Sequence, residues 1–340
     1  MGDGVDARVP YRPPPGVPLI WPSAFGTRFT VFVDTEEEFD WRAPLSRAAR
    51  SVAATRAIPA AHRRFADRGV ALTYLVDHPV ASDDAAVAAI AATLGDGRSA
   101  VGTQLHPWVN PPFDEALSAA NSYVGNLPAA LEAAKLDVLT DLITAAFGAA
   151  PIVYRAGRYG IGPATLGLLA ARGYRFDTSV RAYYDYSSDG GPDFGALGPE
   201  AARVAHGLIE LPLGVIFTGR WRQWRAPYAV AGRLPRGRGA LARLGLVSRT
   251  ALTPEDMPLA DVREAIRVAH GEGLRLLNFS FHSPSLEPGH TPYVGDAADL
   301  ATFWHWWDGV LDLFDRLGVA NASLGEIAAA VGPAGLEPAT

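Results

Sequence analysis

The feature that most constrains the fold is a regular alternation of strand-like and helix-like segments. About seven short runs rich in β-branched and aromatic residues are each followed by a longer helical pattern or a loop. The strand-like runs are residues 28–33, 70–76, 100–106, 151–157, 174–180, 207–217 and 274–282, and the helical patterns are 46–69, 83–94, 127–147, 162–173, 261–272 and 296–317. This alternation favours a parallel sheet, either doubly wound or closed into a barrel.

Length and segment order suggest one large domain behind a short arm. A chain of 340 residues that is 49% hydrophobic can bury a full core, and barrels of this kind reach such a length as one domain. We expect a proline-rich arm over residues 1–26 and a single α/β domain over 27–330. Two stretches, 183–199 and 231–249, interrupt the alternation, and long loops of this kind are usually lids or disordered segments.

Composition excludes several classes of function. The net charge of −6 and the pI near 5.8 give no overall basic field, so we expect no nucleic-acid or membrane partner. The chain has no cysteine, which removes thiolate chemistry and disulfides, and any metal must be bound by oxygen and imidazole. No basic region followed by an apolar run and no long apolar segment occurs, which predicts a cytoplasmic protein.

Polar residues gather where the expected strands end, which is the edge where parallel α/β folds place their chemistry. Asp34 and Glu36 would share one face after the first strand, and Gln104 and His106 one face after the third, because side chains alternate along a strand. The other strand-end candidates are Arg155, Asp177, Ser179 and His282. Taken singly, such acids are as often solvated as functional, and a single strand-end histidine is more often structural than a ligand. Together, they suit metal-assisted hydrolysis.

The order of these motifs resembles the polysaccharide deacetylase family. The resemblance rests on Asp34 after an apolar strand and on the stretches "GTQLHPW", "YRAGRYG", "YRFDTSV" and "FSFHSPS", in the family's order across residues 27–326. It implies the family's irregular seven-stranded (β/α) barrel. It also implies that Asp34 is the general base, that Arg155 orients it, that His282 is the general acid, and that Asp177 tunes His282. An acid that works near neutral pH is well served by an imidazole held by a carboxylate.

The metal motif departs from the family pattern. The family supplies a second carboxylate and two histidines four residues apart, whereas this chain has Gln104 and Trp108 at the two histidine positions. Glu36 and His106 are then the expected ligands of a weak divalent site, with zinc as the first choice because it prefers carboxylate and imidazole. A hydrolase without a metal stays open.

Three residues are candidates for binding substrate: Gln104, Trp108 and Trp221. Trp221 belongs to the stretch "FTGRWRQWRAPY", whose tryptophans could stack on a sugar ring or could equally stiffen a loop by stacking on arginine. We expect a hydrolase of non-peptide carbon–nitrogen amide bonds that deacetylates an N-acetylated sugar or a related small amide. The alternative is a carbohydrate-binding or regulatory protein that kept the fold and lost the ligands.

Overall fold

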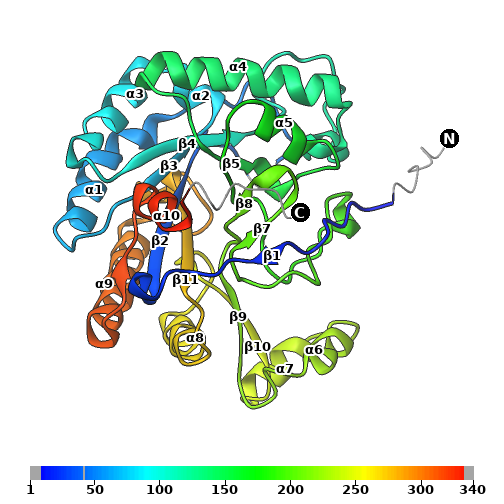
Figure 1. The fold of residues 1–340 in the computed structure, drawn as a ribbon, viewed down its shortest axis with the longest axis vertical. Helices are drawn as coiled ribbons and strands as arrows, with labels where there is room; N and C mark the ends of the chain where they lie inside the picture. The colour runs from blue at the N-terminus through cyan, green and yellow to red at the C-terminus, as the bar shows by residue number, and fades with distance from the viewer. Residues whose placement is uncertain (1–8, 41–42, 333–340) are drawn as a thin grey trace.

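A curled mixed sheet organises the molecule, which we describe from a computed structural model over residues 9–40 and 43–332 (Figure 1). The central strands are joined in the order β8, β6, β5, β4, β3, β2, β11 by parallel pairing. Their bounds are β2 Arg28–Thr35, β3 Thr73–Val76, β4 Ala100–Leu105, β5 Val153–Ala156, β6 Phe176–Asp177, β8 Ile209–Glu210 and β11 Leu276–His282. The parallel arrangement predicted from the alternation is therefore present.

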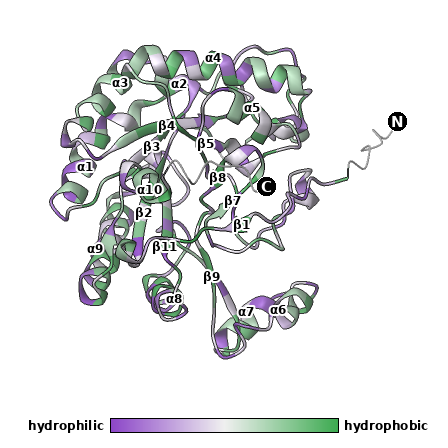
Figure 2. Ribbon diagram, in the orientation of Figure 1, coloured by the Kyte–Doolittle hydropathy of each residue, from purple (hydrophilic) through white to green (hydrophobic). Residues whose placement is uncertain are grey.

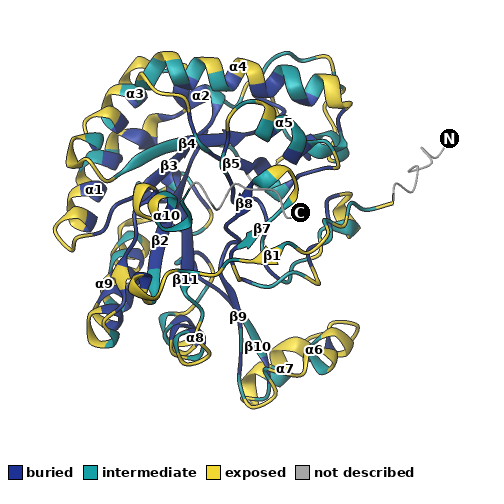
Figure 3. Ribbon diagram, viewed as in Figure 1, coloured by how far each residue is buried: buried dark blue, intermediate teal, exposed yellow. Residues whose placement is uncertain are grey.

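Helices cover the outer face of this sheet. They are α1 Ile58–Ala66, α2 His78–Ala81, α3 Asp84–Ala91, α4 Ala129–Phe147, α5 Thr165–Ala171, α8 Leu259–Gly271 and α9 Ala297–Leu317, with α10 Leu324–Val331 at one end of the strands. The strands are buried and apolar while the helices turn exposed, hydrophilic residues outward (Figures 2 and 3). Two apolar clusters result, one between sheet and helices and one on the inner face of the strands.

The seven-stranded count of the expected irregular barrel is not confirmed. Within the described residues the sheet is ten-stranded and open: β7 Ala202–Arg203 and β1 Val17–Pro18 extend one end with antiparallel pairing, and β12 Ala320–Asn321 pairs with β2. The gap beside β11 is spanned only by isolated hydrogen bonds, such as that from Gly214 N to Asn278 O at 2.9 Å. The short β6 and β8 cannot supply a continuous ladder, which explains the irregular closure.

Two further segment predictions need correction. Residues 207–217 form two strands, because Pro212 follows β8, and the later strand β9 Val215–Thr218 pairs with β10 Ser248–Ala251 in a separate hairpin. The interruption expected at 231–249 contains regular secondary structure rather than only a loop. It carries α7 Gly237–Arg243, which lies with α6 Arg225–Ala231 at the tip of that hairpin, away from the main sheet (Figure 1). Among the helices in the described part of the chain, none has the length and apolar character needed to cross a bilayer.

Candidate active site

A cavity of about 940 Å³ opens at the carboxyl ends of the parallel strands. Its lining includes most of the residues expected from the sequence: Asp34, Glu36, Gln104, His106, Trp108, Arg155 and His282. They converge because parallel pairing sets β2 beside β11 and β4 beside β5, so that His282 lies opposite Asp34 and Gln104 opposite Arg155 in the register. Asp177 and Trp221 are not among the lining residues.

Asp34 is held between a guanidinium and an imidazole. Arg155 Nη1 donates to Asp34 Oδ1 at 2.5 Å, and His282 Nε2 lies 3.7 Å from Asp34 Oδ2. Arg155 is itself fixed, because its Nε donates to Thr178 O and its Nη2 to Thr178 Oγ1, both at 3.1 Å. Asp34 and Arg155 are each 1% exposed. The pair therefore presents one carboxylate oxygen toward His282 from a rigid, buried position.

The carboxylate that binds His282 is Glu255, not Asp177. His282 Nδ1 lies 2.6 Å from Glu255 Oε2, and the His282 backbone N–H donates to Glu255 Oε1 at 3.0 Å. Burial alone would lower the pKa of His282, but the carboxylates of Glu255, Glu36 and Asp34 together raise it to about 10. Burial likewise opposes the charge on Glu255, yet contact with His282 holds the pKa of that carboxyl below its usual value. The two residues form a charged, buried pair.

Asp177 lies on the outer face of the sheet. In the register it stands beside Tyr154 and Glu210, whereas Arg155 is one residue further along and points to the opposite face. Its Oδ1 accepts the hydroxyl of Ser179 at 2.5 Å. Burial raises the pKa of Asp177, although hydrogen bonds from Ser179 and Glu210 oppose the rise. Burial and the charge of Asp177 raise the pKa of the neighbouring Glu210 well above its usual value. The expected contact between Asp177 and His282 is therefore wrong, because the strand alternation places the two side chains on different faces.

Three potential ligands meet on the other side of the cavity. His106 Nε2 lies 3.6 Å from Glu36 Oε2. The side-chain amide nitrogen of Gln104 is 2.9 Å from Glu36 Oε2 and 3.3 Å from His106 Nε2. Burial raises the pKa of Glu36 to about 7, although His282 and His106 act in the opposite direction. Gln104 Oε1 is buried without a hydrogen-bond partner.

The unpaired Oε1 of Gln104 helps to decide whether a cation could bind here. Amide oxygen and nitrogen are assigned from the hydrogen-bond network, so the group can be turned by 180°. Turned in this way, the oxygen of Gln104 would lie where its nitrogen now lies, between Glu36 and His106. Carboxylate, imidazole and amide oxygen would then face one point, which is a donor set that a divalent cation accepts. The residues present fit such an ion.

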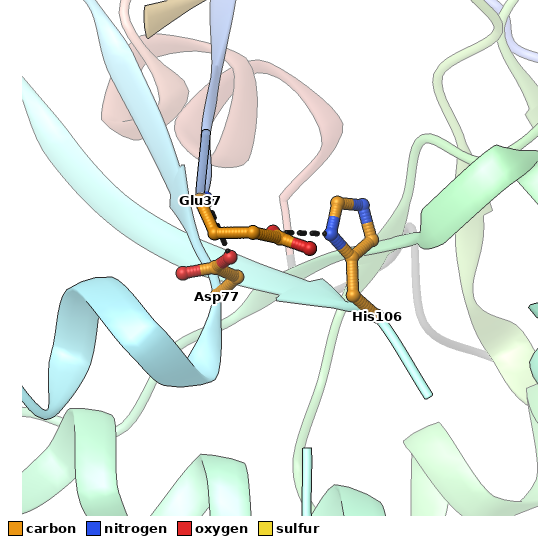
Figure 4. Close-up of side chains that lie close together, drawn as sticks. All are labelled: Glu37, Asp77 and His106. Carbon is orange, nitrogen blue, oxygen red and sulfur yellow. Dashed lines mark hydrogen bonds and ion pairs between the residues drawn. The ribbon is translucent and has the colours of Figure 1, made fainter. Parts of the chain in front are cut away.

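Behind His106 lies a buried chain of acids that the sequence analysis did not assign. His106 Nδ1 is 2.8 Å from Glu37 Oε2, and the backbone N–H of Glu37 donates to Asp77 Oδ2 at 2.9 Å (Figure 4). Glu37 Oε1 accepts the indole N–H of Trp108 at 2.8 Å. Burial raises the pKa of Glu37 to about 8 and that of Asp77 well above its usual range. Glu37 thus fixes the ring of His106 so that Nε2 faces the cavity.

Glu37, Asp77 and His106 could themselves be read as a metal triad, since one potential ligand atom from each lies within 4.8 Å of the others. The imidazole atom that faces Glu37 is Nδ1, and its 2.8 Å separation is that of a hydrogen bond. Glu37 and Asp77 already accept bonds from Trp108 and from Val80 N. An orienting carboxylate behind a ligating imidazole is the usual arrangement at metal sites. We therefore infer that Glu37 orients His106 and that Asp77 holds Glu37, and that neither binds an ion directly.

The two tryptophans have different surroundings from those expected. The ring of Trp108 stacks on His106 with centroids 4.4 Å apart, and the side chain is 1% exposed. Its contacts are those of a residue that positions His106 rather than one that offers a sugar platform. Trp221 is 36% exposed and lies beside the β9–β10 hairpin, where its backbone N–H bonds Leu246 O. The expectation that Trp221 reaches the cavity is wrong, because the hairpin carries it outside the lining.

Comparison with solved structures identifies the fold. No protein-family model and no curated protein matches the sequence. A Mycobacterium smegmatis protein assigned as a polysaccharide deacetylase aligns with a TM-score of 0.55 and 18% identity over 97% of this chain and 98% of that one. An allantoinase, PuuE, aligns with a TM-score of 0.50 and 12% identity over 92% of each chain. A Pseudomonas aeruginosa protein also assigned as a polysaccharide deacetylase aligns with a TM-score of 0.48 and 14% identity, over 91% of this chain and 92% of that one. The chain therefore has the fold of polysaccharide deacetylases, which confirms the resemblance seen in its motifs at the level of architecture.

Proposed function

We propose that this protein hydrolyses the carbon–nitrogen amide bond of an N-acylated sugar or a related small amide. The observation that carries the proposal is the line of contacts from Arg155 through Asp34 and His282 to Glu255 on the cavity wall. It places a held carboxylate and a held imidazole side by side on the cavity wall, with His282 Nε2 3.7 Å from Asp34 Oδ2. General acid–base catalysis needs such a pair.

Asp34 would act as the general base. One of its oxygens is bound by Arg155, which leaves the other, Oδ2, to take a proton from a water molecule in the cavity. The hydroxide formed in this way adds to the carbonyl carbon of the amide. Arg155 keeps the carboxylate in place during this transfer.

His282 would act as the general acid. Its pKa of about 10 keeps the ring protonated at neutral pH, and Glu255 fixes the Nδ1 side. Nε2 then carries the proton on the side of Asp34 and gives it to the amide nitrogen as the carbon–nitrogen bond breaks. The products are a carboxylic acid and a free amine, and the proton held by Asp34 then returns to His282, whose Nε2 lies 3.7 Å from Asp34 Oδ2.

Glu36 and His106, with the amide oxygen of Gln104, would hold a divalent cation beside this pair. Such an ion would polarise the amide carbonyl and lower the pKa of a bound water. Glu37 and Trp108 orient His106 for that role, and a carboxylate–imidazole–amide set with a single imidazole predicts weak binding. Zinc is the ion we expect first.

Acetate release from N-acetylated chito-oligosaccharides tests the proposal. We expect turnover by the wild type with added zinc, cobalt or manganese, and a loss of at least about 10²-fold in Asp34→Asn. Turnover that persists after verified metal removal would select hydrolysis without a metal. Oligosaccharide binding with no turnover under any metal condition would instead identify a binding protein on this fold and refute the proposal.

A further inference from the structure

Two arginines on the cavity wall are not used by the proposed chemistry. Arg158 follows β5 and Arg181 follows β6, and both line the cavity that holds Asp34 and His282. Within residues 9–40 and 43–332, neither guanidinium forms an ion pair with a carboxylate at 4.0 Å or less, whereas Arg155 in the same cavity does. A cation that lines a substrate cavity without an anionic partner is available to a ligand.

Aromatic rings and hydroxyls hold the two guanidiniums in place. Arg158 lies over the ring of Tyr123 at 4.3 Å and donates to Ser122 Oγ at 2.5 Å. Arg181 lies over the ring of Tyr184 at 4.1 Å and donates to Tyr186 OH at 3.4 Å. A guanidinium has five N–H donors. These contacts fix the position of each side chain and leave most of its donors for a ligand.

The backbone at Arg158 is held in an unfavourable conformation. Arg158 and Tyr159 have φ angles of 53° and 61°, in the left-handed region that non-glycine residues seldom adopt. Consecutive residues in this region persist where the surrounding structure enforces them, and they are concentrated at ligand sites. The turn that carries Arg158 into the cavity is therefore a second observation, independent of charge, that this wall is built for binding.

The acids that line the cavity do not pair with these two guanidiniums. They are Asp34, Glu36, Asp40, Asp189, Glu255 and Asp256, and among the described residues none forms an ion pair with Arg158 or Arg181 at 4.0 Å or less. Asp34 and Glu255 are bound to Arg155 and His282. The wall formed by the segments after β5 and β6 carries the two guanidiniums packed on aromatic rings, and it adds one exposed acid, Asp189, to the lining.

We propose that Arg158 and Arg181 bind an anionic group of the substrate, a carboxylate or a phosphate, so that the preferred substrate is an acidic N-acylated sugar or acidic amide. This inference rests on the proposed function for the reacting amide, and it adds the recognition of charge. Guanidinium groups match the planar, multidentate geometry of both anions, and charge-assisted hydrogen bonds are among the strongest in proteins. A neutral chito-oligosaccharide would leave these donors unused.

Direct binding by calorimetry tests the inference without requiring turnover. The protein is the full chain with Asp34→Asn, which keeps any hydrolysis slow. The first pair of probes is N-acetylmuramic acid and its methyl ester, in which a methyl group removes the charge of the carboxyl group. The second pair is N-acetylglucosamine 6-phosphate and N-acetylglucosamine. The first pair reports on a carboxylate and the second on a phosphate.

We expect at least one anion to bind about 10-fold or more tightly than its neutral partner. Arg158→Gln and Arg181→Gln, each added to Asp34→Asn, should reduce that preference to about 2-fold or less. Arg222→Gln is the matched control, because Arg222 carries the same charge outside the cavity and is paired with Glu272. It should leave the preference unchanged. Circular dichroism of each variant verifies folding.

The outcomes separate the two proposals. Equal affinities within both pairs, including no detectable binding of any probe, would overturn the inference, and so would a preference that survives both arginine substitutions. Acetate release from neutral chito-oligosaccharides at equal or higher efficiency than from their acidic counterparts would reject the inference while supporting the hydrolase. An anion preference that depends on the arginines, with no turnover of any amide, would support the inference and reject the proposed chemistry.

Discussion

Glu255 holds His282 at two points, through the ring nitrogen Nδ1 at 2.6 Å and through the backbone N–H at 3.0 Å. The carboxylate therefore fixes the orientation of the imidazole as well as its charge. Ser285 Oγ donates at 2.6 Å to Glu255 Oε1, the oxygen that accepts from the backbone N–H, and this contact fixes the carboxylate in turn. This arrangement has a consequence for the pH dependence of the reaction.

Glu255→Gln should move the alkaline limb of the pH–activity profile downward. The His282 pKa of about 10 depends on the charge of Glu255, so its loss returns that pKa toward its ordinary value of about 6.5. Activity at pH 8–9 should fall much more than activity at pH 6. Measuring kcat between pH 5 and 10 gives the position of the alkaline limb for each protein. Asp177→Asn is the control, since Asp177 is not bound to His282, and an equal shift in both variants would contradict the assignment.

The same pKa makes a prediction about stability. The folded-state pKa of His282 is raised above its unfolded value, so its contribution is fully present below about pH 6.5 and is lost as pH rises through about 10. Urea unfolding of the wild type and of His282→Gln at several pH values should show a stability difference that shrinks over this window. A difference that stays constant between pH 6 and 10 would be evidence against a protonated His282 in the folded protein.

Arg155→Ala should destabilise the protein strongly. Removing one member of a buried ion pair leaves the other charge uncompensated, which costs about 3–5 kcal/mol. Asp34 and Arg155 are such a pair, each 1% exposed. Combining Arg155→Ala with Asp34→Asn should cost less than the sum of the two single changes, because the double variant buries no lone charge. Urea unfolding measures all three variants, and strictly additive losses would mean that the pair does not interact.

Glu37→Gln should weaken metal binding without removing a ligand. Glu37 Oε2 lies 2.8 Å from His106 Nδ1, on the ring side away from the cavity. Loss of such an orienting carboxyl group typically reduces metal affinity by about 10–100-fold. Glu36→Gln and His106→Ala remove proposed ligands and should reduce zinc binding further. Calorimetry with zinc ranks the three. If Glu37→Gln lost more affinity than Glu36→Gln, the ion would belong on the Glu37–Asp77 side of His106.

The part of the site that sequence predicted rests on regular strands. Asp34, Gln104 and Arg155 lie at the ends of continuous strands, so the alternation of side chains placed them in the cavity. The same alternation explains why the prediction for Asp177 was wrong. β6 is only two residues long, and its inward position is taken by Phe176, which packs with the inner apolar cluster.

Glu255 could not be found in this way. It lies in the loop between β10 and α8, and no periodic pattern connects that loop to His282. Glu37 was visible only as one acid in a run of three, beyond Thr35, where the strand ends and alternation no longer applies. The proposed anion site at Arg158 and Arg181 could not be predicted from the sequence either, because the left-handed backbone position at residue 158 is occupied by arginine and not by glycine. Contacts between a loop residue and a strand residue are set by the tertiary structure, so local sequence patterns do not predict them.

A double-mutant cycle on Asp34 and His282 tests the central claim most directly. If the two residues serve as base and acid in one amide hydrolysis, Asp34→Asn and His282→Ala should each reduce kcat by at least about 10²-fold. The double variant should then be little worse than either single variant, because groups that act as a unit lose their effect together. Single variants that keep near-wild-type kcat on an amide substrate would contradict the account.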